Sequence, residues 1–402
     1  MASLLTDLKA IPRNSKILLG VSSSWYFSIG LISSWKSLYI SLFGGYLLVG
    51  FLATVTIGFG ILLSFTGGHL GAAYSEKKII LASVSITAIG YGVFALANTL
   101  ELLLLGVVLM TFMNLGSPCL NSIYFGEVQR QHRGLSSGLR TVCWNVAAFT
   151  APIVSTHLLL TILGFAGMMQ IGLFLTAFCL AASSAIIALL VHPDKLESDD
   201  KPSSPSDKRL MLDGLYTTLS KSPVLRLLLM VTILEAIAYS ISSTFIIFII
   251  TEIVGVTIDQ YSVILLIYGI FFIPLGFLFG RYADRKGRWR CALGFVILPF
   301  VDFGLVFSRG FWQMMFVMLV GAVGVAAWMQ AKYTLITDLT PRQKLASVFS
   351  VFITLPSVFA LFTPLLSGFL LLILPLAWLW LIEVTILGVA ATSLLVAYNL
   401  QT

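Results

Sequence analysis

Residues 280–290 read GRYADRKGRWR, and residues 68–78, which lie 212 positions earlier in the chain, read GHLGAAYSEKK. The same offset of 212 aligns AAFTAP at 147–152 with FALFTP at 359–364. An offset of 211 aligns Glu127 and Arg133 with Asp338 and Lys344. Three pairs of features in nearly the same register predict two homologous halves that repeat one structural unit.

The chain around these motifs is strongly apolar. Of its 402 residues 58% are hydrophobic and 10% are charged, and the mean hydropathy is +0.99. This composition excludes a soluble enzyme and a disordered chain. Because one helical crossing needs about 20 apolar residues, we expect an all-α polytopic membrane protein with twelve transmembrane helices. They are predicted near residues 17–41, 46–71, 79–97, 100–125, 135–162, 165–191, 224–251, 260–283, 289–308, 311–336, 345–372 and 375–398.

A polar segment separates the sixth predicted span from the seventh. Residues 192–222 hold 11 of the 41 charged residues of the chain. We therefore predict an N-terminal six-helix bundle at 1–191, a cytosolic linker at 192–222 and a C-terminal six-helix bundle at 223–402. The bundles are expected to be related by a pseudo-two-fold repeat. Three leucines at helical spacing, Leu212, Leu215 and Leu219, make the second part of the linker either a short amphipathic surface helix or an unstructured tether.

The distribution of the basic residues predicts the orientation of the chain in the membrane. With the linker in the cytosol, 22 of the 24 Lys and Arg residues fall in or near cytosolic connections, and only Lys36 and Arg309 lie toward the other side. The positive-inside rule then places both termini in the cytosol, and we expect the plasma membrane as the location. A nucleic-acid partner is not expected from the net charge of +7, because the basic residues punctuate apolar segments and form no cluster on a soluble face.

The stretch at 280–288 follows the pattern G-x-x-x-D-R-x-G-R. Five residues match it: Gly280, Asp284, Arg285, Gly287 and Arg288. The pattern resembles the signature loop of the major facilitator superfamily of secondary transporters, and span number, repeat and linker position extend the resemblance over the whole chain. It implies two six-helix bundles around a central cavity that opens alternately to either side of the membrane.

The resemblance also implies that this loop helps to close the cytosolic side. Asp284 would face the start of span five near Gly134, where the helix dipole favours a carboxylate. Arg288 would reach Asp338 at the end of span ten. The alternative is that these charges only anchor the loop in the cytosol.

Glycines and departures from the pattern refine this prediction. Gly280 is expected to permit a close approach of helices and Gly287 a tight turn. The first half has Ala72, Ala73 and Ser75 in place of the aspartate, the arginine and the second glycine. It cannot form the matching contact, so an asymmetric cytosolic gate is predicted.

Glu235 is the leading candidate for coupling transport to protons. It lies 12 residues after Pro223, about 18 Å along a helix, and so near the middle of a hydrocarbon core about 30 Å thick. Charges at this depth are costly and usually functional. Because burial favours the neutral form of a carboxyl group, Glu235 is predicted to exchange a proton for a cationic or polar substrate. The alternative is a structural pairing with a nearby hydroxyl group, such as that of Tyr239.

Four other charged residues inside predicted spans are interpreted as follows. Arg140 and Lys332 stand about two helical turns from the cytosolic end. They would either bind an anionic substrate or, as we favour, pair with acidic residues such as Asp338 at the gate. Asp302 and Glu383 are interpreted as helix-packing or subunit contacts.

Aromatic and amide residues occur in the spans that would line the central cavity. A few polar groups among apolar ones are typical of small-molecule sites. The predicted cavity residues are Trp25, Tyr26, Asn114, Trp144, Asn145, Tyr239, Tyr268 and Trp328.

No cofactor or metal ion is expected. The four cysteines fall in apolar segments without a C-x-x-C pair, and the four histidines lie in unrelated places. A membrane-embedded enzyme is therefore excluded, and a static channel would have no use for a two-half repeat with charged cytosolic contacts.

The predicted function is secondary active transport of a small molecule by alternating access, as proton-coupled export of amphipathic compounds. The alternative is an importer or facilitator of a small organic anion that uses Arg140 and Lys332. Support for antiport is partial, because Ala147 and Ala151 replace the glycines of the antiporter-type G-x-x-x-G-P pattern. The expected partners are a small-molecule substrate, protons and the lipid bilayer, with the chain acting as a monomer.

Overall fold

The computed structural model describes residues 12–73, 75–126, 133–191, 222–283, 287–340 and 345–401. Every regular element within these ranges is a helix, as the sequence predicts. Ten helices in the described part of the chain are long and apolar enough to cross a membrane. Of the predicted linker at 192–222, all residues but Ser222 lie outside the described residues, and so does the amphipathic segment within it.

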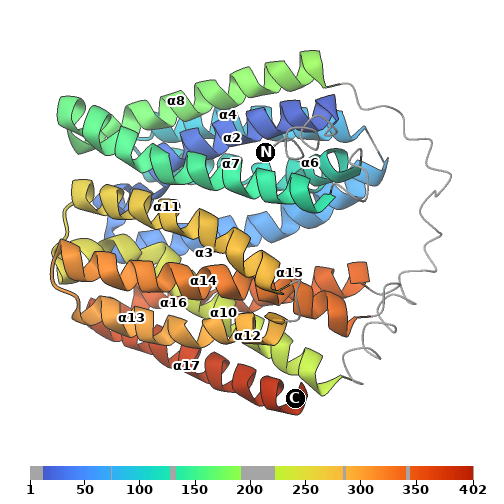
Figure 1. The fold of residues 1–402 in the computed structure, drawn as a ribbon. Coiled ribbons are helices and arrows are strands. Elements are labelled where there is room, and N and C mark those ends of the chain that lie inside the picture. The colour runs from blue at the N-terminus through green and yellow to red at the C-terminus, as the bar shows by residue number, and fades with distance from the viewer. Residues whose placement is uncertain are drawn as a thin grey trace. The chain divides into compact units, whose positions relative to one another are not determined.

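The helices group into two compact units, coloured in Figure 1 along the chain from blue to red. The first unit lies within residues 1–45 and 55–196. Within it α4 packs against α5, α6 and α8, and α2 packs against α7 and α8. Its elements are α2 (Arg13–Ser33), most of α3 (Lys36–Ala73), α4 (Glu76–Ala95), α5 (Leu100–Met110), α6 (Met113–Gly126), α7 (Arg133–Val154), the π-helix η2 (Ser155–Leu160) and α8 (Thr161–Leu190).

The second unit lies within residues 46–54 and 197–402. In it α10 packs against α15 and α17, and α14 packs against α11, α12 and α13. Its elements are α10 (Pro223–Phe248), the π-helix η3 (Ile249–Val254), α11 (Ile258–Tyr282), α12 (Arg288–Ala292), the 3₁₀-helix η5 (Leu293–Ile297), α13 (Leu298–Phe307), α14 (Phe311–Leu339), α15 (Leu345–Ala360), α16 (Thr363–Leu370) and α17 (Leu376–Gln401).

Glycines interrupt two of the long helices. In α3 the backbone leaves the helical region at Gly44 and Gly45, and φ at Gly45 is +64°. In α8 it does so at Gly164, where φ is +69°. Side chains with a Cβ atom rarely adopt a positive φ, so glycine is required at both positions. These breaks fall in the short gaps predicted between residues 41 and 46 and between residues 162 and 165.

The two units share one plan of helices. Adding 212 to the bounds of α4, Glu76 and Ala95, gives Arg288 and Phe307, the first residue of α12 and the last of α13. Equivalent pairs of helices also pack together, because α2 contacts α7 and α8 where α10 contacts α15 and α17. Gly68 and Gly280 both lie in the last turns of their helices, α3 and α11. The shared bounds and packing support the repeat predicted from the sequence.

Residues 46–54 of α3 pack tightly within the second unit. The hydroxyl of Tyr46 donates to both carboxylate oxygens of Glu252, at 2.8 and 2.9 Å. A Cβ atom at Gly50 would lie 2.2 Å from the carbonyl oxygen of Pro364, and one at Gly368 would lie 2.8 Å from the carbonyl oxygen of Tyr46. Glycine is therefore needed at both contacts, where the backbones of α3 and α16 touch.

Large apolar side chains cover the outer surfaces of the helices. The exposed fraction is 74% for Phe178, 72% for Phe300 and 73% for Trp312. Apolar surface on this scale is costly in water and suits contact with lipid. The chain is an integral membrane protein.

Candidate functional site

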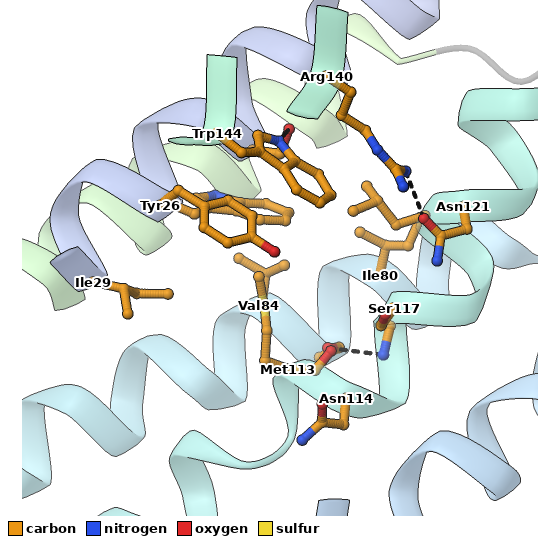
Figure 2. A pocket seen from close by; sticks show the side chains of 15 residues that line it. Tyr26, Ile29, Ile80, Val84, Met113, Asn114, Ser117, Asn121, Arg140 and Trp144 are labelled. Atoms are coloured by element: carbon orange, nitrogen blue, oxygen red, sulfur yellow. Dashed lines mark hydrogen bonds between the residues drawn. The ribbon is translucent and has the colours of Figure 1, made fainter. Parts of the chain in front are cut away.

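The first unit encloses a cavity of about 280 Å³ between α2, α4, α6 and α7. Figure 2 shows this cavity from close by. Among the described residues that line it, Arg140 is the only charged one. The lining consists of Ser22, Trp25, Tyr26, Ile29, Ile80, Ser83, Val84, Met113, Asn114, Gly116, Ser117, Leu120, Asn121, Arg140 and Trp144. The cavity is thus mostly apolar, with one cation and a few polar groups, which is the usual make-up of a small-molecule site.

Arg140 is held in the cavity by a residue of a neighbouring helix and by two aromatic rings. Its Nη1 donates to Oδ1 of Asn121 on α6 at 2.7 Å, as the dashed line in Figure 2 marks. Its guanidinium carbon lies 4.4 Å from the ring centroid of Trp144 and 5.2 Å from that of Tyr124. Stacking and hydrogen bonding together fix the orientation of a planar guanidinium.

Aromatic rings extend this arrangement along one wall. The rings of Tyr26 and Trp144 stack with centroids 4.4 Å apart and an angle of 23° between their planes. Nε1 of Trp144 donates to the Ser22 hydroxyl at 2.9 Å, which fixes the indole. Trp25 also lines the cavity as a buried side chain, 2% exposed, whose Nε1 has no hydrogen-bond partner among the described residues.

The second unit contains a cavity of about 290 Å³ between α10, α14 and α15. These helices are the repeat equivalents of α2, the segment containing α6, and α7. The cavity is lined by Thr232, Glu235, Ala236, Tyr239, Lys332, Ile336, Phe352, Ile353 and Pro356. Unlike the first cavity, it holds charges of both signs.

Glu235 has two partners on α14. Nζ of Lys332 lies 2.7 Å from its Oε2, and Nε1 of Trp328 donates to its Oε1 at 2.8 Å. The exposed fraction is 11% for the Glu235 side chain and 20% for that of Lys332. Lys332 and Trp328 are four residues apart, so they lie on the same face of α14 and reach the carboxylate together.

This arrangement corrects one sequence-based interpretation. Lys332 pairs with Glu235 on another helix and not with Asp338 at the gate. An ammonium and an indole contact the Glu235 carboxylate, and the alternative pairing with a nearby hydroxyl group stays a prediction. The sequence does not reveal these two partners of Glu235, because they lie 97 and 93 residues away in the chain.

Burial separates the two interpretations of Glu383, a helix-packing contact and a subunit contact. Glu383 is 0% exposed, so it lies inside the unit and cannot contact another subunit. Asp302 and Glu383 both lie within electrostatic range of Tyr239, which lines the cavity beside Glu235. Trp380 ties α17 to α13 by donating to the backbone carbonyl of Asp302 at 2.9 Å. The two carboxyl groups are therefore part of the polar interior of the second unit.

Comparison with known proteins identifies the family. A model described as Major Facilitator Superfamily matches residues 17–301 and 228–400. The chain belongs to the major facilitator superfamily. The resemblance inferred from the 280–288 loop is thereby confirmed. Among curated proteins none matches the chain by sequence.

Solved structures of transporters share the fold of this major facilitator superfamily chain. A bacterial homologue of the human lysosomal transporter Spinster, inward-facing and unoccupied, matches with a TM-score of 0.71 and 15% identity over 96% of each chain. The nucleoside transporter NupG matches with a TM-score of 0.74 and 14% identity over 96% of this chain and 99% of its own. A POT family transporter in complex with a thioalcohol-conjugated peptide matches with a TM-score of 0.73 and 14% identity over 97% and 98%.

The predicted cavity residues of this superfamily member divide into three groups. Trp25, Tyr26, Asn114, Arg140 and Trp144 line the first cavity. Glu235, Tyr239 and Lys332 line the second, and Trp328 contacts it through Glu235. Asn145 and Tyr268 line neither of these two cavities. The ring of Tyr268 stacks on that of Phe272, with the ring centroids 5.6 Å apart. Asn121 was not among the predicted residues, although it is an amide on a predicted cavity helix like Asn114.

The predicted gate of this superfamily member is described only in part. Arg288 and Asp338 form an ion pair, as the resemblance implies, with side chains 33% and 43% exposed. Gly134 lies in the first turn of α7, whereas Asp284 and Arg285 lie outside the described residues. The gating roles of these residues stay predictions.

The surroundings of the two loop glycines differ. A Cβ atom at Gly280 would meet only Oε1 of Gln330, at an ordinary 3.8 Å, so no close helix approach requires glycine there. Gly287 has a φ of −95°, which any residue can adopt. A Cβ atom at Gly287 would lie 2.5 Å from the ring of Tyr282, so glycine makes room for this ring.

The described residues offer no group of three or more His, Cys, Asp or Glu side chains placed to bind a metal ion. The four cysteines are free, and Cys119 and Cys291 are buried.

Proposed function

We propose that this chain is a secondary active transporter that exports a small amphipathic molecule by alternating access and exchanges it for protons at Glu235. Its twelve spans form two six-helix bundles joined by the cytosolic linker. It acts as a monomer in the plasma membrane, with both termini in the cytosol. Membership of a transporter superfamily supports transport, and the finer features rest on the observations that follow.

The helix breaks support twelve spans. The candidate span Val142–Leu190 contains 49 residues, about twice what one crossing needs, and Gly164 divides it. The segment of α2 and the first residues of α3, up to the break at Gly44, accounts for another crossing. The remaining nine candidate spans contribute one crossing each.

The ion pair of Glu235 and Lys332 is the observation that carries proton coupling. Charges inside a membrane span are usually part of an ion or proton path, and this pair lines a cavity within the second unit. A proton on Glu235 would remove the charge that holds Lys332. The site therefore has two states, a paired one and a protonated one with Lys332 released, and a transport cycle needs such a pair of states.

The structure alters the alternative function, in which the chain imports or facilitates the passage of a small organic anion. In the anion alternative, Arg140 and Lys332 jointly bind the substrate, but the charge of Lys332 is compensated by Glu235. Arg140 lines the cavity of the first unit, so the anion alternative now depends on this residue and not on the pair. Import or facilitation of an anion remains the competing function.

A flux measurement with Glu235→Gln tests the proposal. The purified full-length chain is reconstituted in liposomes, the membrane potential is clamped, and a pH gradient is imposed. Two probes are used, the aromatic cation ethidium and the aromatic anion benzenesulfonate, which does not cross lipid as a neutral acid. Glu101→Gln is the control, because Glu101 is an exposed carboxylate on α5.

We expect the pH gradient to drive flux of at least one probe in the wild type and in Glu101→Gln. Glu235→Gln should lose this gradient-driven flux yet still exchange the probe between compartments of equal pH, because an amide cannot carry a proton. Gradient-driven flux that persists at the wild-type rate in Glu235→Gln would refute proton coupling through this residue.

A further inference from the structure

We infer that Trp328 is a positioning residue of the proton site. Its indole N–H holds Oε1 of Glu235, so an incoming proton takes Oε2 and displaces Lys332. The inference rests on the proposed function, because it assigns the step that links protonation of Glu235 to the release of Lys332.

The two carboxylate oxygens of Glu235 are divided between two donors. Nε1 of Trp328 donates to Oε1 at 2.8 Å, and Nζ of Lys332 donates to Oε2 at 2.7 Å. An indole N–H and an ammonium group can donate hydrogen bonds but cannot accept them. A proton added to either oxygen therefore competes with the donor already there, and the donor that is held less firmly gives way.

Trp328 is held firmly. Its side chain is 1% exposed, and its ring packs on that of Phe295 in η5 with the centroids 4.9 Å apart. The backbones of η5 and α14 touch one turn before Trp328, because a Cβ atom at Gly324 would lie 2.9 Å from the carbonyl oxygen of Gly294. The indole therefore has no room to move away from Oε1.

Lys332 is the donor that can move. Its side chain is 20% exposed and lines the cavity of about 290 Å³, and its four-carbon stem is flexible. Its Nζ lies 5.8 Å from the ring centroid of Trp328, within the range of a cation–π contact. A proton on Oε2 thus releases the ammonium toward the cavity and the indole ring, and Oε1 remains as the carbonyl oxygen bonded to the indole N–H.

The indole N–H makes release of Lys332 obligatory. Without it, the proton could occupy Oε1 while Lys332 kept its bond to Oε2, and protonation would no longer displace the ammonium. The bond from the indole also stabilises the charged form of Glu235, because hydrogen bonds to an ionised group are stronger than those to a neutral one.

Other ionisable groups lie around Glu235 or around Tyr239, which lines the same cavity. They are Lys332 on α14, Tyr239 on α10, Tyr268 on α11, Asp302 on α13 and Glu383 on α17. The helices α15 and α16 also pack against α10 and contain no ionisable side chain. Glu252 on η3 accepts hydrogen bonds from Tyr46 instead. A change confined to the indole N–H leaves all these groups in place.

Infrared difference spectroscopy of the purified full-length chain in lipid tests the inference, because a protonated carboxyl group has a carbonyl band that a carboxylate lacks. The band that disappears in Glu235→Gln belongs to Glu235. In the wild type we expect this band at the lowered frequency of a carbonyl group that accepts a hydrogen bond. A wild-type band at the frequency of a free carbonyl group would overturn the inference without any further variant.

Trp328→Phe then removes the N–H and keeps an aromatic ring. The pH at which the Glu235 band reaches half its height should rise by about one unit, a tenfold change in proton binding. The band itself should move to the frequency of a free carbonyl group. The control is Trp380→Phe, because Trp380 is 0% exposed and donates to the backbone carbonyl of Asp302 at 2.9 Å.

The control removes a buried indole N–H of the same unit that does not touch Glu235, so it should change neither the midpoint nor the band. An unchanged midpoint and band in Trp328→Phe would overturn the inference. An equal shift in Trp328→Phe and Trp380→Phe would also overturn it, because the shift would then reflect a general loosening of the unit.

Failure of this inference is distinguishable from failure of the transport proposal, because the infrared titration needs no flux. Gradient-driven flux that depends on Glu235, with a midpoint that Trp328→Phe leaves unchanged, would overturn the role of Trp328 and leave proton-coupled transport intact. A midpoint and band that depend on Trp328, in a chain with no gradient-driven flux of either probe, would support the role of Trp328 and contradict the transport cycle.

Discussion

Replacing Lys332 by methionine should destabilise the second unit by removing one member of its intramembrane ion pair. Lys332 and Glu235 are 2.7 Å apart, and their side chains are 20% and 11% exposed. Without the ammonium, the carboxylate keeps the hydrogen bond from the indole of Trp328 but no longer has a cation beside it. Breaking a buried pair typically costs about 3–5 kcal/mol because a charge is left without compensation. The partial exposure of this pair favours the lower end, about 3 kcal/mol.

The double variant Lys332→Met with Glu235→Gln should recover most of this loss, because no buried charge remains. We therefore expect a coupling free energy of about 2 kcal/mol between the two positions in a double-mutant cycle. The assay is equilibrium unfolding in mixed micelles, followed by circular dichroism. Lys78→Met is the control, since Lys78 is exposed at the start of α4, and it should change the free energy of unfolding by less than about 0.5 kcal/mol.

Additive losses would refute the reasoning. If the double variant loses as much stability as the two single variants together, Glu235 and Lys332 do not interact in the folded protein. The two-state account of proton coupling would then lose its structural basis.

Two further predictions use the same unfolding assay. Gly50→Ala should lower the free energy of unfolding by about 1–3 kcal/mol, because its Cβ atom would lie 2.2 Å from the carbonyl oxygen of Pro364. Gly92→Ala, which meets nothing within 4 Å, should be neutral or stabilising by up to about 1 kcal/mol, and equal effects at both glycines would contradict the close packing of α3 on α16. Arg288→Gln should cost less than about 1 kcal/mol, since the ion pair with Asp338 is partly exposed, and a much larger loss would contradict that exposure.

The sequence predicts the fold well because membrane spans are a local property. Each span is an uninterrupted apolar run, so its position follows from composition and length. The breaks at Gly44, Gly45 and Gly164 fall in predicted gaps because glycine at a span end is also a local signal. The depth of Glu235 follows from its distance along one helix from Pro223.

The partners of the site residues were not predictable in the same way. Lys332 and Trp328 meet Glu235 through the packing of α14 on α10, which no local pattern encodes. A carboxylate and a lysine in separate spans are each readable as functional, but their pairing depends on helix rotation. The burial of Glu383 depends likewise on which face of α17 packs inward. The sequence therefore gives candidates, and the packing decides which of them meet.

Proton movement is the most direct test of the central claim, that this chain couples transport of a small molecule to protons through Glu235. Liposomes that contain the reconstituted chain and an entrapped pH-sensitive dye are exposed to a gradient of whichever probe, ethidium or benzenesulfonate, the flux assay shows to be moved. The account predicts that the internal pH changes with the wild-type chain, at a rate that follows probe flux, and stays constant with Glu235→Gln. Probe flux through the wild type without a pH change, or an equal pH change with Glu235→Gln, would contradict it.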